Sequence, residues 1–511
     1  MDNAAKPSEW TLSEEEFLAC MRVLRAVEAD RSHLTRLTQT ERREFLTLAG
    51  LVAKPEGHDL RRMTKAFRRA KRDAAKEHDR RVIDQSGLRM QRRSAMYTPL
   101  WLERPKAEDT RDGAELRRER ACYVCKKPFA KMHRYYDSMC DACGDFNYEK
   151  RGQTANLHGH HALVTGARVK IGFQAALKLL RAGAHVYVTT RFPVDAADRY
   201  AGEPDFSSFR SRLQIHGLDL RHTPSVELFT RFLTDRLPRL DYILNNACQT
   251  VRRPAGFFQH LLAKESATTD GMPAARRSVL ASHDELRHAL EQPPMRDGAV
   301  AAALAAGPGK GLLHSAALSQ RRYLDEDFRE GESLFPVDRF DEDRQQVDLR
   351  EVNSWRLRMH EVETPELLEV QLVNAIAPYI LNARLKPLML RTPGFHKHVV
   401  NVSAMEGQFY RSTKTDKHPH TNMAKAALNM MTRTSAADYV KDGIHMNAVD
   451  TGWVTDEDPA AHAARKAGLG FSPPLDIIDG AARIVDPIFS GWLSGIHVWG
   501  QFLKDYKPAP W

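Results

Sequence analysis

A strand, a glycine-rich turn and a helix follow one another near residue 165, and this succession constrains the fold more than any other feature of the chain. The apolar run 162–164 predicts a buried strand, residues 165–172 the turn, and residues 174–181 a helix. Glycines at such a turn let a pyrophosphate approach the helix N-terminus, where free N–H groups and the helix dipole favour anions. The sequence therefore predicts a nucleotide-binding α/β fold.

Further strand patterns follow the first one, with helical patterns between several of them. They occupy residues 185–191, 213–215, 240–244, 398–403, 444–449 and 496–500, and residues 370–381 and the segment opened by Lys425 have helical patterns. Alternating strands and helices of this kind favour a doubly wound parallel sheet. We expect one such domain over residues 156–511, with an insertion at about residues 255–360.

The motifs at these strand ends resemble those of the short-chain dehydrogenase/reductase family. The family's threonine-glycine turn, its acidic residue after the third strand and its Asn-Asn-Ala motif all have counterparts in this chain. The resemblance spans roughly residues 157–504 and implies a Rossmann-like domain that binds a nicotinamide dinucleotide. It also implies that Asn245 steadies the sheet. The cofactor-binding residues that it implies are Thr165, Gly166, Arg168, Lys170, Ile171, Gly172, Arg191, Asp219, Leu220, Asn246, Ala247, Lys425, Thr451, Gly452, Val454 and Thr455.

Three of the four catalytic positions of that family have their usual residue. In the family a serine orients the carbonyl, a tyrosine gives the proton, a lysine lowers the tyrosine pKa and holds the ribose, and an asparagine anchors a water relay. Ser403, Lys425 and Asn374 match three of these roles by resemblance, whereas Thr421 stands in the tyrosine position. An aliphatic hydroxyl is a much weaker acid than a phenol with a pKa near 10. We therefore expect Thr421 to be structural or to line the substrate site.

Two nearby residues are alternative proton donors. His420 has a side chain that titrates near neutrality, and Tyr410 follows the strand that ends in the catalytic serine. The sequence leaves the choice between them open. Lys170, Cys248 and Thr451 also replace residues typical of the family, namely two glycines and a proline. Together these changes indicate a remodelled pocket.

The end of the second strand indicates which dinucleotide the pocket prefers. Thr190 and Arg191 stand where an acid would grip a ribose 2′-hydroxyl, and arginine suits a 2′-phosphate. The sequence therefore favours NADP over NAD.

Two pairs of cysteines precede the dehydrogenase-like region, within a predicted module at residues 119–155. Cys122 and Cys125 are separated from Cys140 and Cys143 by residues 126–139, a spacing typical of a zinc ribbon or a treble clef. Four thiolates form the closed tetrahedral set that structural zinc prefers. The alternatives are two disulfides or free thiols, and His133 is an additional candidate ligand.

The region before the module, residues 1–118, is predicted to be helical and basic. Ser13 and Glu16 predict a capping box at its first helix. Residues 61–93 hold thirteen Lys or Arg against four acids, a net charge of +9 out of +10 for the whole chain. Such a stretch is either a solvated helix face or a surface for nucleic acid or an acidic partner.

The insertion and the remaining composition allow coarser expectations. Residues 299–311 are rich in alanine and glycine and predict a flexible segment, while residues 252–254 and 345–348 are expected near the cofactor edge. The insertion is a substrate lid, a partner-binding arm or a surface excursion. The chain lacks a secretory signal pattern and a run of eighteen apolar residues, so we expect a soluble cytoplasmic protein without membrane association.

Three functional hypotheses follow. The first is an NADP-dependent oxidoreductase that acts on a carbonyl or alcohol. The second is a non-catalytic dinucleotide-binding sensor or scaffold, which engages a protein partner through the zinc module and the insertion. The third is a nucleic-acid-associated protein that binds through residues 61–93. Family resemblance further implies a homo-oligomer.

Overall fold

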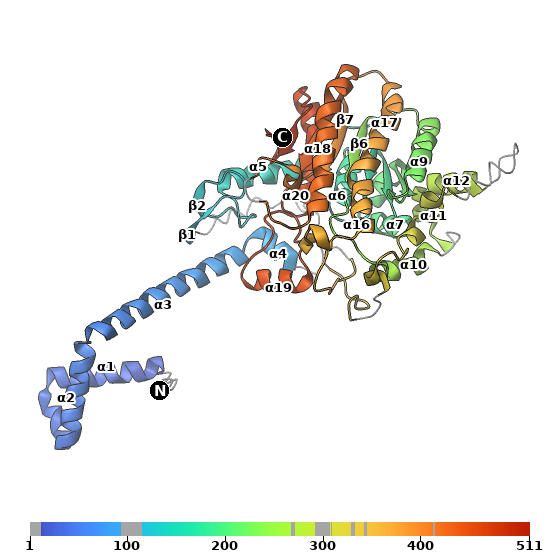
Figure 1. The fold of residues 1–511 in the computed structure, drawn as a ribbon. Coiled ribbons are helices and arrows are strands. Elements are labelled where there is room, and N and C mark those ends of the chain that lie inside the picture. The colour runs from blue at the N-terminus through green and yellow to red at the C-terminus, as the bar shows by residue number, and fades with distance from the viewer. Residues whose placement is uncertain are drawn as a thin grey trace. The chain divides into compact units, whose positions relative to one another are not determined.

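The chain forms two compact units, Met1–Glu77 and His78–Trp511. The computed structural model describes residues 12–93, 115–266, 271–291, 307, 309–328, 333–341, 345–411 and 414–511. All strands of the described residues belong to the second unit (Figure 1). The division falls inside a helix, well before the boundary at residue 118 that the sequence suggests. No helix in the described ranges is long and apolar enough to span a membrane.

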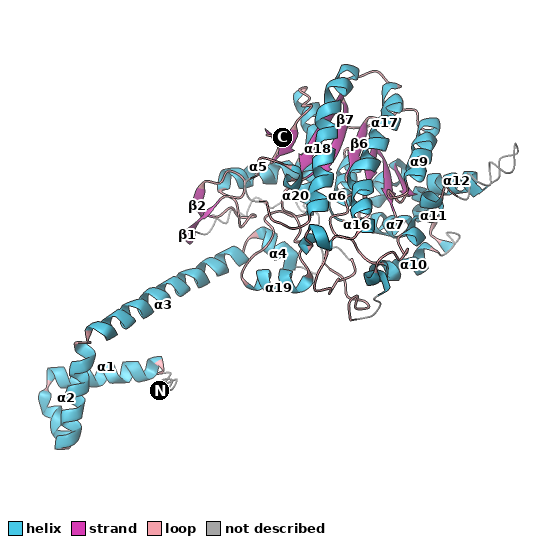
Figure 2. Ribbon diagram, in the orientation of Figure 1, coloured by secondary structure: helices cyan, strands magenta, loops and turns pink. Residues whose placement is uncertain are grey.

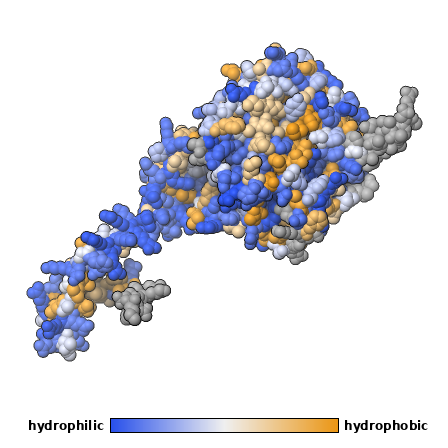
Figure 3. All heavy atoms as spheres, viewed as in Figure 1, coloured by the Kyte–Doolittle hydropathy of each residue, from blue (hydrophilic) through white to orange (hydrophobic). Residues whose placement is uncertain are grey.

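The first unit is helical, as expected, and consists of α1 (Glu14–Ala29), a 3₁₀ turn (Arg31–Arg36), α2 (Gln39–Ala53) and most of α3 (Gly57–Asp84). The predicted capping box is confirmed: Glu16 N–H donates to Ser13 Oγ at 3.2 Å, and Ser13 N–H donates to Glu16 Oε2 at 2.7 Å. Neither α1 nor α2 buries a side chain. Their apolar residues are exposed, as the orange atoms of Figure 3 show, and include Phe17, Leu18, Met21, Leu48 and Leu51.

The second unit is built on an eight-stranded sheet of order β10-β9-β8-β7-β6-β3-β4-β5 (Figure 2). Neighbouring strands are parallel except β9 and β10. The strand order reverses between β3 and β6, and this confirms the predicted doubly wound topology. The strands are β3 (His161–Thr165), β4 (His185–Thr190), β5 (Leu213–Gly217), β6 (Tyr242–Asn245), β7 (Lys397–Ser403), β8 (Ile444–Asp450), β9 (Phe502–Lys504) and β10 (Lys507–Ala509).

The prediction of a last strand at residues 496–500 is wrong, because the strand β9 begins only at Phe502. Gly495 and Gly500 both adopt left-handed backbone conformations, with φ of 70° and 66°. Such residues bracket the segment with sharp bends that an extended strand does not contain. The alternation of apolar residues there is therefore not strand pairing.

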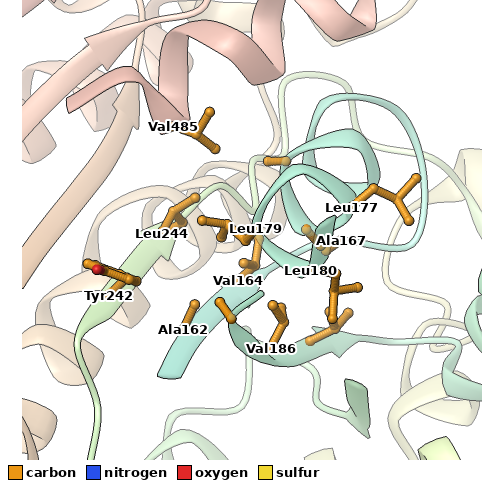
Figure 4. Packing of buried hydrophobic residues seen from close by; sticks show 14 of the residues in the cluster. Ala162, Val164, Ala167, Leu177, Leu179, Leu180, Val186, Tyr242, Leu244 and Val485 are labelled. Atoms are coloured by element: carbon orange, nitrogen blue, oxygen red, sulfur yellow. The ribbon is translucent and has the colours of Figure 1, made fainter. Parts of the chain in front are cut away.

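Helices cover both faces of the sheet, and alternate residues of each strand point to opposite faces. Ala162 and Val164 of β3 pack on one face with Leu177 and Leu180 of α6 (Figure 4), whereas Leu163 packs on the other face. Burial on both faces explains why the strand sequences are almost continuously apolar. The first face is covered by α6 (Lys170–Arg181), α7 (Pro193–Ala201) and α20 (Ile477–Ser494), and the second by α9 (Thr223–Arg236), α17 (Ala377–Leu390) and α18 (Pro419–Tyr439).

The cysteine module precedes β3 and is a small α+β structure. It consists of the hairpin β1 (Glu115–Ala121) and β2 (Pro128–Lys131), followed by α5 (Asp141–Gly152). The end of α3 and the short helix α4 (Gly87–Arg93) lie against it: Arg117 N–H donates to Asp79 Oδ1 at 2.7 Å, and Leu88 N–H donates to Tyr135 O at 2.9 Å. The module therefore includes residues that the sequence assigned to the basic region.

The insertion is largely helical where it is described, and it packs on the edge of the sheet. A Cβ on Gly217 at the end of β5 would lie 2.8 Å from Ser315 Oγ and 2.9 Å from His283 Cε1. Most of the predicted flexible segment lies outside the described residues, although Lys310 and Gly311 belong to a short helix. The helices are α10 (Gln259–Glu265), α11 (Ala274–Arg277), α12 (Ala281–Glu291), α14 (Lys310–Leu313) and α15 (Ser315–Leu318).

Three more helical segments complete the second unit. Helix α16 (Thr364–Gln371) continues through a π-helical turn (Leu372–Ile376) into α17. Helix α8 (Phe206–Phe209) precedes β5, and α19 (Ala460–Gly468) follows β8. The helical pattern predicted for residues 370–381 is thus confirmed, with a local π turn that the pattern does not reveal.

Histidines form a hydrogen-bonded chain near the amino-terminal ends of β7 and β8. His396 Nδ1 lies 2.9 Å from His497 Nε2, and His497 Nδ1 lies 3.0 Å from His398 Nε2. Burial, together with the nearby rings of His445 and His396, lowers the pKa of His497 to about 4. His497 is therefore neutral at physiological pH.

We expect the His497→Asn variant to have a shallower loss of stability in acid. Above pH ~6.5 a histidine is neutral in the folded and the unfolded chain. Between pH ~6.5 and 4, His497 binds a proton in the unfolded chain but stays neutral in the folded chain. The free energy of unfolding therefore falls as the pH falls. Chemical denaturation across this range measures the slope, and the value at pH 7.5 separates lost packing from lost titration. An unchanged slope contradicts the assignment.

Candidate functional site

A pocket of about 550 Å³ lies at the carboxyl ends of β3, β4, β5 and β6. Its size is within the range of about 300–1,000 Å³ that is typical of ligand sites, and its place is the crevice where doubly wound folds bind ligands. The pocket brings together most of the predicted cofactor-binding residues: Gly166, Arg168, Lys170, Ile171, Gly172, Arg191, Asp219, Leu220, Asn246, Ala247 and Thr455. The predicted residues Thr165, Lys425, Thr451, Gly452 and Val454 are not part of its lining.

The glycine-rich turn is fixed by bonds to the end of β6. Ala247 N–H donates to Thr165 Oγ1 at 3.0 Å, and Asn246 Nδ2 donates to Gly166 O at 3.2 Å. A Cβ on Gly172 would lie only 2.3 Å from Asn246 Nδ2, so this position requires glycine. The N-cap residue of α6, Val169, forms no side-chain capping bond, which leaves the first N–H groups of the helix available to an anion.

Two cations of the turn have acidic neighbours. Arg168 is buried and forms an ion pair with Asp195 at 2.6 Å. Lys170 adopts a left-handed conformation with φ of 55°. Burial alone would raise the pKa of Glu457, but the charge of Lys170 and a hydrogen bond from Thr455 outweigh burial and lower it. An acid is thus placed opposite Lys170 in the pocket.

Arg191 lies in the pocket at the end of β4 and differs from the other arginines there. Its guanidinium lies 4.6 Å from the ring centroid of Phe258 and 5.5 Å from that of Phe192. No carboxylate of the described residues forms an ion pair with it, and burial and the neighbouring Arg221 lower its pKa to about 10. A desolvated cation in this state gains from an anionic ligand.

The acid at the end of β5 is engaged within the protein. Asp219 lines the pocket and forms an ion pair with Arg221 at 2.6 Å, and Arg221 pairs in turn with Glu369 at 2.8 Å. Asp219 N–H donates to Gly311 O at 2.9 Å. The insertion thereby holds Asp219, which the family resemblance implies is a cofactor-binding residue. The insertion ends reach the pocket as expected, through residues 252–253 and 345–348.

The three residues that match catalytic positions of the family are buried and hydrogen-bonded within the protein. Ser403 Oγ donates to Asn429 Oδ1 at 2.6 Å, and Lys425 Nζ donates to the carbonyl oxygen of Val402 at 2.8 Å. Asn374 Oδ1 accepts from the N–H of Gln249 at 2.8 Å. Each lies close to the carboxyl ends of the strands, but none is among the residues that line the pocket.

The alternative proton donors lie in two different environments. His420 is buried, with Nε2 at 3.5 Å from Oε1 of the equally buried Glu366, and Thr421 Oγ1 has no hydrogen-bond partner among the described residues. Tyr410 is 49% exposed, and its hydroxyl contacts Met405 Sδ at 3.8 Å. The structure does not bring any of these three residues into the pocket lining.

Asn245 holds the centre of the sheet, as the resemblance implies. Its Nδ2 donates to Asn382 Oδ1 and to Asn401 Oδ1, both at 2.8 Å, and Asn401 Nδ2 donates to Thr432 Oγ1 at 2.9 Å. These side chains are buried. The network joins β6 and β7 to α17 and α18, and so fixes the helix that carries Lys425.

The four module cysteines form a cluster that fits a metal ion. Their sulfur atoms all lie within 4.8 Å of one another, and none of the six cysteines of the chain is in a disulfide. Cys122 and Cys125 lie on the turn of the β1–β2 hairpin, and Cys140 and Cys143 lie at the N-terminus of α5. Supply of the second pair by a helix favours the treble clef over the zinc ribbon.

His133 is not part of this cluster. Its Nδ1 accepts from the N–H groups of Tyr135 and Tyr136 at 3.1 and 3.2 Å, and its Nε2 lies 3.2 Å from Asp145 Oδ1. Both ring nitrogens are therefore used in the fold. The backbone N–H of Lys127 lowers the pKa of Cys125 to about 7, which favours the thiolate form of this residue, whereas burial raises the pKa of Cys140 and Cys143.

Two residues of the predicted basic surface have a structural role that the sequence does not signal. Arg89 donates to Asp137 Oδ2 at 2.6 Å and to Gly470 O at 2.9 Å, and Arg92 donates to the carbonyls of Pro473 and Leu475 at 2.9 and 2.7 Å. The contacts with Gly470, Pro473 and Leu475 join residues 381 to 383 positions apart in the chain. They hold the loop before α20 rather than an external partner.

Comparison with known proteins agrees with this architecture. Residues 160–268 match the family model described as short chain dehydrogenase, and residues 352–469 match the model described as enoyl-(acyl carrier protein) reductase. The uncharacterized protein R665 of Acanthamoeba polyphaga mimivirus is 31% identical over 396 residues, which cover 75% of this chain and 74% of that protein. Retinol dehydrogenase 11 of Mus musculus is 32% identical over 109 residues, 20% of this chain, and is matched over only 34% of its own length.

Solved structures with a similar fold include two complexes with NADP. RhlG of Pseudomonas aeruginosa, described as an NADP active-site complex, has a TM-score of 0.41 and 17% identity, covering 68% of this chain and 95% of its own. A short chain dehydrogenase of Burkholderia cenocepacia J2315 in complex with NADP has a TM-score of 0.40 and 16% identity, covering 68% and 96%. From the strand topology, the fixed glycine turn and the matched family models, we conclude that the chain belongs to the short-chain dehydrogenase/reductase family.

Proposed function

We propose that this protein is an NADP-dependent oxidoreductase of the short-chain dehydrogenase type that acts on a carbonyl or alcohol. The observation that carries the proposal is the pocket itself, with Arg191 at the end of β4. The buried guanidinium of Arg191 has lost hydration, and a 2′-phosphate beside it would form a charge-assisted hydrogen bond in its place. The N-terminus of α6, which has no side-chain cap from Val169, suits the pyrophosphate. NAD offers only a hydroxyl at the first of these positions.

The dinucleotide would supply the hydride, and the chain would handle the charge that develops on the substrate oxygen. Reduction of a carbonyl adds a hydride to carbon and a proton to oxygen, so the oxygen needs a donor as its charge grows. Ser403 at the end of β7 is our choice for this donor, and Lys425 for holding the ribose. Ser403 would exchange its bond to Asn429 for one to the substrate oxygen.

A second candidate is a dinucleotide-binding protein without turnover. It is favoured by the internal bonds of Ser403 and Lys425, by their absence from the pocket lining, and by Thr421 in place of a phenol. In this alternative the dinucleotide is a ligand that the protein senses.

The two candidates differ in how the Ser403→Ala variant behaves. We expect both the native protein and the variant to bind NADPH, as measured by fluorescence titration, since Ser403 does not line the pocket. For an oxidoreductase, NADPH oxidation with a panel of aldehydes and ketones should occur in the native protein and fall at least ~100-fold in the variant. Binding without turnover in both proteins supports the sensor. Failure of the native protein to bind NADPH or NADH contradicts both candidates.

A further inference from the structure

The cysteine module holds both ends of a loop that forms one wall of the pocket. We propose that metal bound to its four cysteines sets the shape of this wall, so that metal binding and dinucleotide binding strengthen each other. The proposal rests on the proposed dinucleotide site. We call residues 452–476 the wall segment.

The cysteine cluster has the geometry of a tetrathiolate metal site. The sulfurs of Cys125 and Cys140 lie 3.8 Å apart, and four sulfurs at ~2.3 Å from a tetrahedral zinc ion lie about that far from one another. Backbone bonds pre-form the first chelating loop: Cys122 N–H donates to Lys127 O at 2.9 Å, and Lys126 N–H donates to Cys122 O at 3.0 Å. Cys140 N–H points at Cys122 Sγ at 3.5 Å. The cluster therefore has the ligand set and the spacing that fit a tetrahedral zinc ion.

Tyr123 connects this chelating loop to the start of the wall segment. It lies between Cys122 and Cys125, and its hydroxyl oxygen accepts a hydrogen bond from Trp453 N–H at 2.9 Å. The adjacent Gly452 has φ of 75°, and a Cβ there would lie 3.2 Å from the Tyr123 hydroxyl oxygen. The first residues of the wall segment thus lie directly against a side chain that the metal site positions.

The same module holds residues near both ends of the wall segment. Val454 and Leu475 are buried in one apolar cluster with Cys122, Phe129 and other module residues. Arg92 of α4 donates to the carbonyls of Val454 and Leu475 at 3.3 and 2.7 Å. Both ends of the segment are therefore anchored beside the cysteines.

The middle of the wall segment lies in the pocket. Residues 455–460 line it, and Glu457 lies where its charge acts on Lys170 of the glycine-rich turn. Ile171 of that turn also packs against the module cluster. Because the wall segment is anchored at both ends, the residues between its anchors are held in place beside the pocket. Loosening the module would therefore displace groups on two sides of the pocket.

The coupling has a thermodynamic consequence that can be measured from either site. If zinc raises the affinity for the dinucleotide, the dinucleotide must raise the affinity for zinc by the same factor. Couplings between sites in proteins are typically about 5–150-fold. We expect a value of roughly tenfold or more, because zinc stabilises the fold of a module that a small core alone supports weakly.

The test uses the full chain with its zinc content measured. NADPH dissociation constants are determined by fluorescence titration before zinc removal with a chelator, after removal, and after zinc is restored. We expect removal to weaken binding about tenfold and restoration to reverse the loss, and NADPH at saturation to slow zinc release to a chromogenic chelator. Equal dissociation constants with and without zinc overturn the coupling. If the zinc-loaded protein does not bind NADPH at all, the proposed function fails instead.

If zinc removal unfolds the chain, the Tyr123→Phe variant tests the coupling instead. It keeps all four thiols and the ring but loses the oxygen that accepts from Trp453 N–H. We expect full zinc content, an unchanged circular dichroism spectrum and NADPH binding weakened several-fold. Tyr148→Phe is the matched control, since its ring packs against His133 and Tyr135 inside the module, and should bind NADPH as the native protein does. Equal NADPH affinity in both variants overturns the role of Tyr123.

Discussion

Replacement of Arg151 by methionine is expected to lower the free energy of unfolding by about 3–5 kcal/mol. Arg151 ends α5 and is buried, with Nη1 at 2.6 Å from Asp476 Oδ1 and 2.9 Å from Asp479 Oδ1. Its Nη2 also donates to the hydroxyl of Tyr135 at 2.8 Å. Without the guanidinium, the buried carboxylate of Asp476 loses its counter-charge, while the methionine only restores volume. Denaturation by urea measures the loss.

The pH dependence distinguishes lost charge pairing from lost packing. Burial alone would raise the pKa of Asp476, but the charge and hydrogen bonds of Arg151 outweigh burial and lower it to about 2. The native pair thus stabilises the fold above pH ~3.9 and loses this effect as the pH falls toward 2. In the variant, buried Asp476 favours its protonated form. The loss of unfolding free energy relative to the native protein should therefore be largest at pH ~7 and smaller near pH ~4. A deficit that does not change with pH contradicts this account.

Removal of all three charges provides the control. The triple variant Arg151→Met, Asp476→Asn, Asp479→Asn removes these three buried charges and leaves buried Arg483 paired with Asp505 at 3.2 Å. Asn at the N-cap of α20 can still accept the bond that Asp476 accepts. It should recover most of the lost stability. A triple variant as unstable as Arg151→Met would mean that the packing of the guanidinium, and not its charge, is what matters.

Replacement of Arg191 by leucine is expected to weaken NADP binding by roughly 10–100-fold and to leave NAD binding nearly unchanged. A hydrogen bond to a charged group is worth about 1.5–3 kcal/mol, and only NADP offers a charged group to this arginine. Leucine keeps the apolar contact with Phe192 and Phe258. Titrations with both dinucleotides give the ratio of affinities directly.

NAD serves as the internal control for this variant, because it tests whether the pocket is otherwise intact. Arg210→Leu, at an exposed position after α8, should change neither affinity. Equal losses for NADP and NAD would mean that Arg191 supports the pocket rather than the 2′-phosphate. Unchanged NADP binding would mean that Arg191 does not cause a preference for NADP over NAD.

The catalytic positions illustrate how far a motif can be interpreted. Ser403 and Lys425 stand in the right order: Ser403 ends the strand β7, and Lys425 lies in the second turn of the helix α18. Their side chains are nevertheless bonded to Asn429 and to the Val402 carbonyl. Sequence order places a residue on an element, but the partner that its hydroxyl or ammonium meets depends on neighbours contributed by other segments. The motif therefore identifies the family more firmly than it identifies a working active site.

The sequence by itself determined the features whose causes are local. The glycine turn needs residues without a Cβ within a few positions, buried strands need continuous apolar runs, and a zinc chelate needs paired cysteines at short spacing. Each requirement is met within a few neighbouring residues, so it can be recognised without knowing the rest of the chain. The strand predicted at residues 496–500 shows where such local interpretation fails, because the left-handed glycines at the ends of this segment prevent strand pairing.

Only the tertiary structure decided which of these parts contact one another. It placed Tyr123 beside Trp453, 330 positions later, and Arg92 beside Leu475, 383 positions later. It also packed Phe258 of the insertion over Arg191. Contacts of this kind arise because burying apolar surface brings distant segments together, and no spacing or periodicity in either segment encodes its partner. The pocket, the position of Arg191 in it and the contacts between the wall segment and the cysteine module exist only through such packing.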